Sequence, residues 1–219
     1  GVLFHQFLCD RQRALAVAQE LVEQHAIKAL VVACNTATAA AVQLLRAAHP
    51  DLPVAGVEPA LKPAAAMSAT SRIAVFATRS TLASTRLRGL QRALQAAATF
   101  VLQPCDGLAA AIEADDATET IALCTRYIGA AGQFGSKPGQ MDVLVLGCTH
   151  YPFAQPHLSR LLPPAVRLVE TGEPVARQVA RLLDARALSR GGRRAGKLQL
   201  LSSGDLRPLQ AAAARWLGA

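Results

Sequence analysis

Two cysteines, Cys34 and Cys148, each follow a short apolar run and precede small polar residues. The runs at residues 30–33 and 144–146 each predict a buried parallel strand, and the residues after such a strand form the functional edge of the sheet. A helix is predicted to follow each cysteine, and directly before the start of a helix unpaired N–H groups and the helix dipole favour the thiolate. The pattern therefore predicts two reactive thiols, each at the carboxyl edge of a sheet.

Two such thiols suit a reaction that moves a proton. A reaction that inverts a carbon centre removes a proton from one face and delivers another to the opposite face. A thiol, with an ordinary pKa of about 8.5, can act as base in one direction and acid in the other. Because Cys34 and Cys148 are far apart in the sequence, they can meet only across two half-molecules. The alternative, two buried structural cysteines, leaves their matching contexts unexplained.

The segments around these cysteines, residues 33–37 and 147–152, resemble the two signatures of the cofactor-independent aspartate/glutamate racemases. Further matches keep the family's order: residues 58–60, Ala77-Thr78 with Thr81, and residues 171–173. The resemblance runs from about Ala14 to the end and is strongest to the members that act on glutamate. It implies an α/β fold of two doubly wound parallel-sheet domains related by pseudo-twofold symmetry, with the active site in the cleft between them.

The resemblance also implies an activity: cofactor-independent racemisation of L-glutamate and D-glutamate by two-base transfer between Cys34 and Cys148. His150 matches the family's catalytic histidine and follows Cys148 closely enough to exchange a proton with it. Glu113 matches a glutamate of the family's catalytic site. An equally favoured alternative is that Glu113 is a solvent-exposed carboxylate on a helix without a catalytic role. The implied context is cytoplasmic supply of D-glutamate for peptidoglycan, the cell wall and cell shape.

Short hydrogen-bond donors at strand ends and helix starts are expected to hold the two substrate carboxylates. As isolated residues they would be interpreted as helix caps, and the resemblance favours substrate binding instead. They are Asn35, Thr36, Thr78, Thr81 and Thr149. No metal and no cofactor is expected.

The front of the chain departs from the family. The family's Asp-Ser-Gly strand and its Tyr-Gly pair are not found before Cys34, and residues 1–9 match nothing at that position. We therefore expect a truncated or altered N-terminus. Two alternatives stay open: a racemase acting on aspartate, a hydantoin or another amino acid, and an inactive remnant or interaction protein.

Composition narrows the functional class. The 219 residues are 52% hydrophobic, which is ample for a core, but no apolar stretch approaches the roughly 18 residues of a membrane helix. Five cysteines without a Cys-x-x-Cys pair predict reduced thiols rather than a disulfide framework or zinc site. The basic residues behind the net charge of +8 are scattered along the chain. Their one cluster, residues 190–197, contains glycines and predicts a solvated loop. Aromatic residues make up only 4% of the chain, which leaves few side chains for stacking on bases. A nucleic-acid partner is thus not expected, and a homodimer stays open.

Helical and extended patterns alternate along the chain, which predicts parallel sheets with helical crossovers. The predicted strands are residues 29–33, 53–57, 72–77, 99–102, 144–146, 166–169 and 197–201. The predicted helices are residues 10–24, 37–48, 81–97, 107–114, 117–131 and 173–188, with a last one from Asp205. With crossings at residues 58–59 and 170–172, the first domain is predicted at 1–57 plus 170–219 and the second at 58–169.

Overall fold

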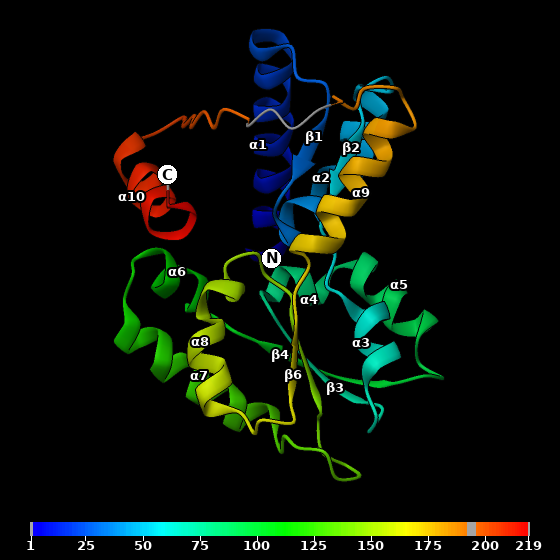
Figure 1. Cartoon of the computed structure of the whole chain (residues 1–219), viewed down its shortest axis with the longest axis vertical. Coiled ribbons are helices and arrows are strands. Elements are labelled where there is room, and N and C mark those ends of the chain that lie inside the picture. Colours follow the sequence, from blue (N-terminus) through cyan, green and yellow to red (C-terminus); the bar gives the residue numbers. More distant parts are fainter. Residues whose placement is uncertain (1, 192–195, 219) are drawn as a thin grey trace. The chain divides into compact units, whose positions relative to one another are not determined.

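The computed structural model describes residues 2–191 and 196–218, with the backbone alone for residues 2–10 (Figure 1). The chain divides into two compact units, Gly1–Leu188 and Ser189–Ala219. The first unit contains both parallel sheets and every candidate site residue.

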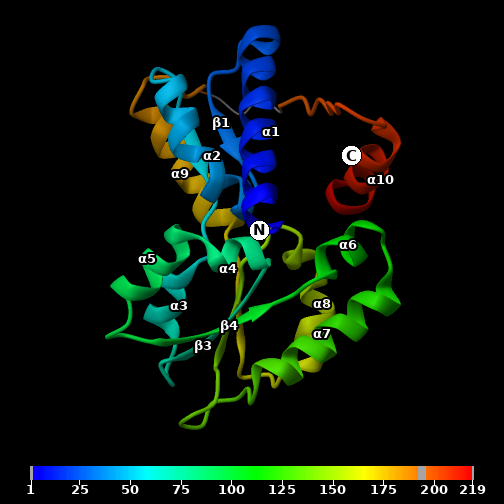
Figure 2. The same ribbon diagram turned by 180° about the vertical axis from the view of Figure 1, so that it is seen from behind.

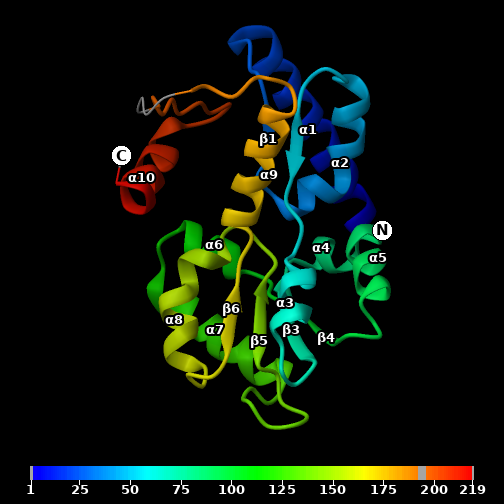
Figure 3. The ribbon, with the colours of Figure 1, turned by 45° about the vertical axis from the view of Figure 1, so that its right-hand side comes forward.

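The first sheet is a parallel pair, in which Leu30, Val31 and Val32 lie opposite Val54, Ala55 and Gly56. Its elements are α1 (Val2–His25), β1 (Leu30–Val32), α2 (Asn35–Ala48) and β2 (Val54–Gly56). Helix α1 packs against α2, and both α2 and α9 (Gly172–Asp184) contact β2. Figure 3 shows α9 running alongside this sheet. Its small core joins α1, α2 and β2 through Ala18, Ala41, Val42, Leu45 and Val54.

The second sheet has four parallel strands in the order β4-β3-β5-β6. They are β3 (Arg72–Ala77), β4 (Thr99–Pro104), β5 (Val143–Leu146) and β6 (Arg167–Val169). The helices between them are α3 (Leu61–Met67), α4 (Arg79–Ala83), α5 (Thr85–Ala93), α6 (Leu108–Glu113), α7 (Ala117–Ala131), the 3-10 helix η1 (Tyr151–Ala154) and α8 (Gln155–Leu161).

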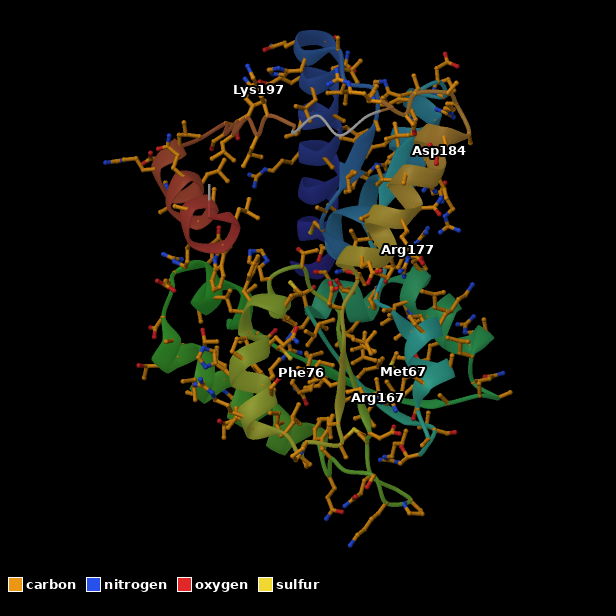
Figure 4. All side chains as sticks on the ribbon, in the orientation of Figure 1. Met67, Phe76, Arg167, Arg177, Asp184 and Lys197 are labelled. Carbon is orange, nitrogen blue, oxygen red and sulfur yellow. The ribbon has the colours of Figure 1, made fainter. Side chains whose placement is uncertain are left out.

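Alternate residues of β3 and β5 pack against two different layers of helices, because successive side chains of a strand point to opposite faces of the sheet. Phe76 and Leu144 pack in the layer of α6, α7 and α8, and Val75 and Val145 pack in the layer of α3 and α5. Figure 4 shows Phe76 among the side chains on the α7 and α8 side. With apolar residues on both faces, this is the doubly wound parallel arrangement, and the predicted α/β fold class is confirmed.

The strand order creates a switch point between β3 and β5. The chain leaves β3 for β4 on one side, then returns to place β5 on the other side and β6 beyond it. In open parallel sheets, ligands bind in the crevice at the carboxyl ends of the strands where the direction reverses. Thr78 directly follows β3, and Cys148 follows β5 after Gly147, so both lie at this point.

Most predicted elements are present, although α1 begins at Val2 rather than at residue 10, and two predictions are wrong. The helix predicted over residues 81–97 is divided into α4 and α5, because Ser84 has extended dihedrals and its Oγ caps α5 by accepting from the Leu87 N–H. The strand predicted over residues 197–201 is not formed, and within its own described unit there is no strand with which it could pair. Thr171 stands at the N-cap of α9, as expected, but without a side-chain capping bond.

The second unit contains α10 (Leu206–Leu217), which begins where predicted. The Asp205 carboxylate accepts from the Arg207 N–H and pairs with its guanidinium. Residues 192–195 of the basic cluster lie outside the described residues. The domain boundaries predicted from the sequence stay a prediction. Within residues 2–191 and 196–218, no helix is both long enough and apolar enough to cross a membrane.

Candidate active site

Cys34 stands at the N-cap of α2, as the sequence predicted. Its backbone is extended, and its Sγ accepts a hydrogen bond from the Ala37 N–H at 3.5 Å. The buried Thr38 fixes this helix start to both strands, since its Oγ1 donates to the Val32 carbonyl at 3.1 Å and accepts from the Val57 N–H at 3.0 Å. The thiol is exposed, so α2 presents it to a ligand without further rearrangement.

A cavity of about 420 Å³ opens beside this thiol. Apolar side chains of α1, β1 and α2 form most of its wall, and Arg13, Cys34 and Thr36 are its polar members. Its lining residues come from the first sheet and its helices, so the cavity borders Cys34 but not Cys148.

Cys148 is placed by the glycine before it. The Gly147 N–H donates to the Phe76 carbonyl at 2.7 Å, and a Cβ on Gly147 would lie 2.9 Å from both that oxygen and the Ala77 Cβ. Only glycine fits such a close approach of β5 to β3. The next element is the 3-10 helix η1, which begins at Tyr151, so this thiol does not directly precede an α-helix as Cys34 does.

Burial raises the pKa of the Cys148 thiol above its ordinary value, and the charge of Cys34 raises this pKa further. The backbone N–H groups of residues 149–151 act in the opposite direction, because they favour the thiolate. Burial is the larger of the two effects that raise this pKa, and the charge of Cys34, which belongs to the other sheet, is the smaller.

His150 lies between a thiol and a carboxylate. Its Nδ1 is 3.8 Å from the Cys148 Sγ, and its Nε2 is 3.8 Å from Oε2 of Glu113 at the end of α6. The histidine is half-exposed and the glutamate side chain is 74% exposed. With one ring nitrogen toward each partner, the imidazole can exchange a proton with the thiol while the carboxylate stabilises its charged form.

Three hydroxyl groups connect the ends of β1 and β3. The Thr36 Oγ1 lies 3.1 Å from the Thr78 Oγ1 and 3.3 Å from the Thr81 Oγ1, and Thr78 donates to Thr81 at 3.0 Å. Thr36 belongs to α2, whereas Thr78 caps α4. Helices α2 and α4 are in contact, as Figure 2 shows. The hydroxyl cluster thus joins the start of the first thiol's helix to the switch point of the second sheet.

Asn35 directly follows Cys34 and is only 5% exposed. Its Oδ1 and Nδ2 are both buried, and neither has a hydrogen-bond partner among the described side chains and backbone groups. A buried, unpaired amide costs about 1 to 3 kcal/mol. Such groups in native proteins need an explanation, and binding a polar ligand is one.

The structure therefore brings the predicted residues into two connected groups. Cys148, His150 and Glu113 form one, and Thr36, Thr78 and Thr81 form the other; Asn35 stands beside Cys34, and Thr149 is half-buried between Cys148 and His150. Among the residues described, no group of three or more His, Cys, Asp and Glu side chains is arranged to hold a metal. The catalytic and binding roles of these residues stay predictions.

The sequence reasoning missed three positioning residues: Thr38, Gly147 and Tyr151. Gly147 and Tyr151 lie inside the second cysteine motif, so the signal was present, but their contacts are with residues distant in the sequence. Nothing in the local sequence distinguishes Thr38 from an ordinary helix residue.

Residues 6–179 match the family model described as Asp/Glu/Hydantoin racemase. The chain is 44% identical to the glutamate racemase of Pseudomonas aeruginosa (strain PAO1) over 187 residues, covering 84% of this chain and 68% of the relative. It is 41% identical to the glutamate racemase of Ectopseudomonas mendocina over 210 residues, covering 95% and 77%.

Solved structures agree with this similarity. Escherichia coli glutamate racemase, crystallised with L-glutamate and the activator UDP-MurNAc-Ala, superposes with a TM-score of 0.74 at 30% identity. That match covers 81% of this chain and 66% of the other. Glutamate racemase from Thermus thermophilus, in complex with β-chloro-D-alanine, gives a TM-score of 0.71 at 29% identity, covering 97% and 77%. The chain thus spans about two thirds to three quarters of the length of these relatives.

Proposed function

The chain belongs to the Asp/Glu/hydantoin racemase family, and from that membership and the positions of its two thiols we propose that it interconverts L-glutamate and D-glutamate. The observation that supports this most directly is that Cys34 and Cys148 follow strands of two different sheets, whose ends are joined by the contact between Thr36 and Thr78. Two acid–base groups on separate sheets can act on opposite faces of one α-carbon. The relatives described above are named glutamate racemases, which favours glutamate as the substrate.

In the proposed reaction, one cysteine as thiolate removes the α-proton from one enantiomer, and the other as thiol delivers a proton to the opposite face. For the other enantiomer the two roles are exchanged. His150 returns the Cys148 sulfur to its working protonation state, with Glu113 stabilising the charged imidazole. One sulfur gains the proton removed from the substrate and the other loses the proton delivered to it, and proton exchange through His150 and solvent then restores the starting states, so the chemistry needs no cofactor.

The substrate carboxylates are hydrogen-bond acceptors and require donors. The hydroxyls of Thr36, Thr78 and Thr81 and the Asn35 Nδ2 supply neutral donors near the first thiol, and Thr149 adds one beside the second. Charge-assisted hydrogen bonds of this kind are worth about 1.5 to 3 kcal/mol each. The unpaired Asn35 amide would gain the partner that it lacks.

The product D-glutamate would serve peptidoglycan synthesis, and with it the cell wall and cell shape, in the cytoplasm. The site would lie between a first domain of residues 1–57 plus 170–219 and a second of residues 58–169. A homodimer is compatible with this activity.

Incubation of the protein with L-glutamate in deuterated water tests the proposal. Deuterium at the α-carbon together with loss of optical rotation is the expected result. L-Aspartate and a 5-substituted hydantoin serve as parallel substrates, and a variant with both Cys34→Ser and Cys148→Ser serves as the control for exchange by contaminants. Exchange of aspartate or the hydantoin alone would reassign the substrate, and absence of exchange with every substrate would contradict catalysis by this chain.

A further inference from the structure

Tyr151 is one of two tyrosines in the chain, and its side chain is fully buried. It directly follows His150, and its N–H donates to the Cys148 carbonyl at 3.1 Å. At the other end of the side chain, the hydroxyl donates to the Cys105 carbonyl at 3.2 Å. One residue thus connects the backbone of the second thiol to a loop that follows the edge strand β4.

That loop begins α6. Gly107 is the N-cap of this helix, with a left-handed φ of 78°, and the carbonyls of Cys105 and Asp106 precede it. The Asp106 carbonyl accepts a 2.5 Å hydrogen bond from the hydroxyl of Tyr127, so both tyrosines hold consecutive carbonyls at the same turn. Helix α6 also packs against η1, and its buried Leu108 and Ile112 lie in the same core cluster as Tyr151.

Glu113 is the last residue of α6. Because its side chain is 74% exposed, burial does not hold the carboxylate 3.8 Å from His150. Its position depends on where the backbone of α6 begins and how the helix is oriented. The hydroxyl of Tyr151 holds the start of α6 and thereby the orientation of this helix. Since His150 directly precedes Tyr151, the helix is held relative to the segment that carries His150.

We propose that Tyr151 is a positioning residue that holds α6 against the His150 segment, sets the distance between Glu113 and His150, and so controls proton exchange at Cys148. The inference rests on the proposed function, since it assigns a role within that same site. A phenylalanine here would keep the buried ring and lose the connection to Cys105. The carboxylate of Glu113 and the imidazole of His150 would then no longer be held at a fixed distance.

The test compares Tyr151→Phe, Glu113→Gln and the double variant in the full chain. The readout is the rate at which iodoacetamide alkylates Cys148, measured by mass spectrometry of its peptide and divided by the rate for the exposed Cys34. Each single variant is expected to lower this ratio about threefold to tenfold, the scale of one hydrogen bond. The double variant should be no lower than the worse single variant, because both changes remove the same interaction.

Ser68→Ala is the matched control. It also removes a hydroxyl that donates a partly buried hydrogen bond, to Asp142 at 2.5 Å, but at the amino end of β5, opposite to Cys148. Its alkylation ratio should stay within about twofold of wild type at a similar loss of stability. An unchanged ratio in Tyr151→Phe, or a double variant whose loss is the product of the single losses, would overturn the positioning role.

The alkylation readout does not require turnover, so it separates the two claims. If wild type fails to exchange the α-proton of glutamate, the proposed function is contradicted. If the single variants still lower the alkylation ratio and the double variant lowers it no further, the positioning role is supported. Where wild type does racemise, Tyr151→Phe should lower kcat by a similar factor and leave KM within about twofold.

Discussion

Burial raises the pKa of Cys148, and the charge of Cys34 adds to this rise although the two residues follow strands of different sheets. Cys34 caps α2 beyond β1, and Cys148 lies beyond β5 at the switch point of the second sheet. The hydroxyl contact of 3.1 Å between Thr36 and Thr78 holds the same two edges together. The thiols therefore belong to one electrostatic site.

Removing the charge of Cys34 should change the titration of Cys148. Because a nearby negative charge disfavours the thiolate, Cys34→Ala is expected to lower the pKa of Cys148. At any pH below that pKa, the thiolate fraction rises and alkylation of Cys148 becomes faster. Iodoacetamide rates between pH 6 and about 10 measure the shift. Superimposable pH profiles for the variant and wild type would show that the thiols are not coupled.

Replacing either cysteine by serine should abolish racemisation. A serine hydroxyl is too weak an acid to replace the thiol of Cys34 or Cys148 in either role. Each single variant should still remove a proton from one enantiomer, so elimination from a glutamate analogue with a good leaving group should persist in a hand-dependent way. Chiral chromatography with both enantiomers of the analogue provides the measurement. Unchanged racemisation by one variant would exclude its cysteine as a base.

Asn35→Ala should weaken substrate binding with little loss of stability. The buried amide has no partner in the described protein, so its removal is expected to change the free energy of unfolding by less than about 1 kcal/mol. KM for glutamate should rise at least about tenfold. Thr38→Val is the matched variant on the same helix: its hydroxyl has two partners, and its loss should cost about 1 to 3 kcal/mol. A normal KM in Asn35→Ala would remove this residue from the site.

Asp142 should contribute pH-dependent stability. Burial by itself raises the pKa of this carboxyl, but hydrogen bonds from Ser68, Ala69 and Thr70 together hold it below its ordinary value of 3.8. Because the pKa of this carboxyl is lower in the folded than in the unfolded state, its ionised form stabilises the folded protein. This stabilisation is complete above about pH 3.8 and is lost as the pH falls through the pKa of the folded state. Asp142→Asn should cost about 1 to 3 kcal/mol at pH 7.

Urea unfolding of wild type and Asp142→Asn at pH 7 and at about pH 3 tests this sign. The stability difference between the two proteins should shrink at the lower pH, because this pH lies below the ordinary pKa and the carboxyl of the unfolded chain then holds a proton. A difference that stays constant or grows between these two pH values would contradict the argument.

Gly147→Ala should displace Cys148. Its Cβ would lie 2.9 Å from the Phe76 carbonyl oxygen, which belongs to the backbone of a buried strand and cannot move aside easily. We expect a loss of about 1 to 3 kcal/mol in the free energy of unfolding and a fall of about a hundredfold in racemisation. Gly89→Ala on α5, where a Cβ meets no atom within 4 Å, should instead gain about 0.5 to 1 kcal/mol and keep full activity. Equal behaviour of the two variants would argue against close packing as the cause.

The sequence alone was sufficient for the parallel α/β architecture and for the location of the two thiols. Strand β3 and helix α7 have the predicted bounds, because apolar runs and helical periodicity are local patterns whose burial can be satisfied in few ways. Cys34 caps α2 as expected for the same reason: a cap is set by the few residues around it. The two wrong predictions concern segments in which another interaction outweighed the local pattern or in which a required neighbour was missing. Ser84 broke a continuous helical pattern by capping a new helix, and residues 197–201 had no neighbouring strand in their unit.

The relationships that make a site were decided only by the tertiary structure. The proximity of Glu113 to His150 and of Thr36 to Thr78 depends on the strand order β4-β3-β5-β6 and on the contact between α2 and α4. The role of Tyr151 likewise arises from the distant carbonyl that its hydroxyl reaches. Local sequence determines which backbone conformation a segment prefers, whereas distances between segments result from burying all apolar faces at once in one packed structure.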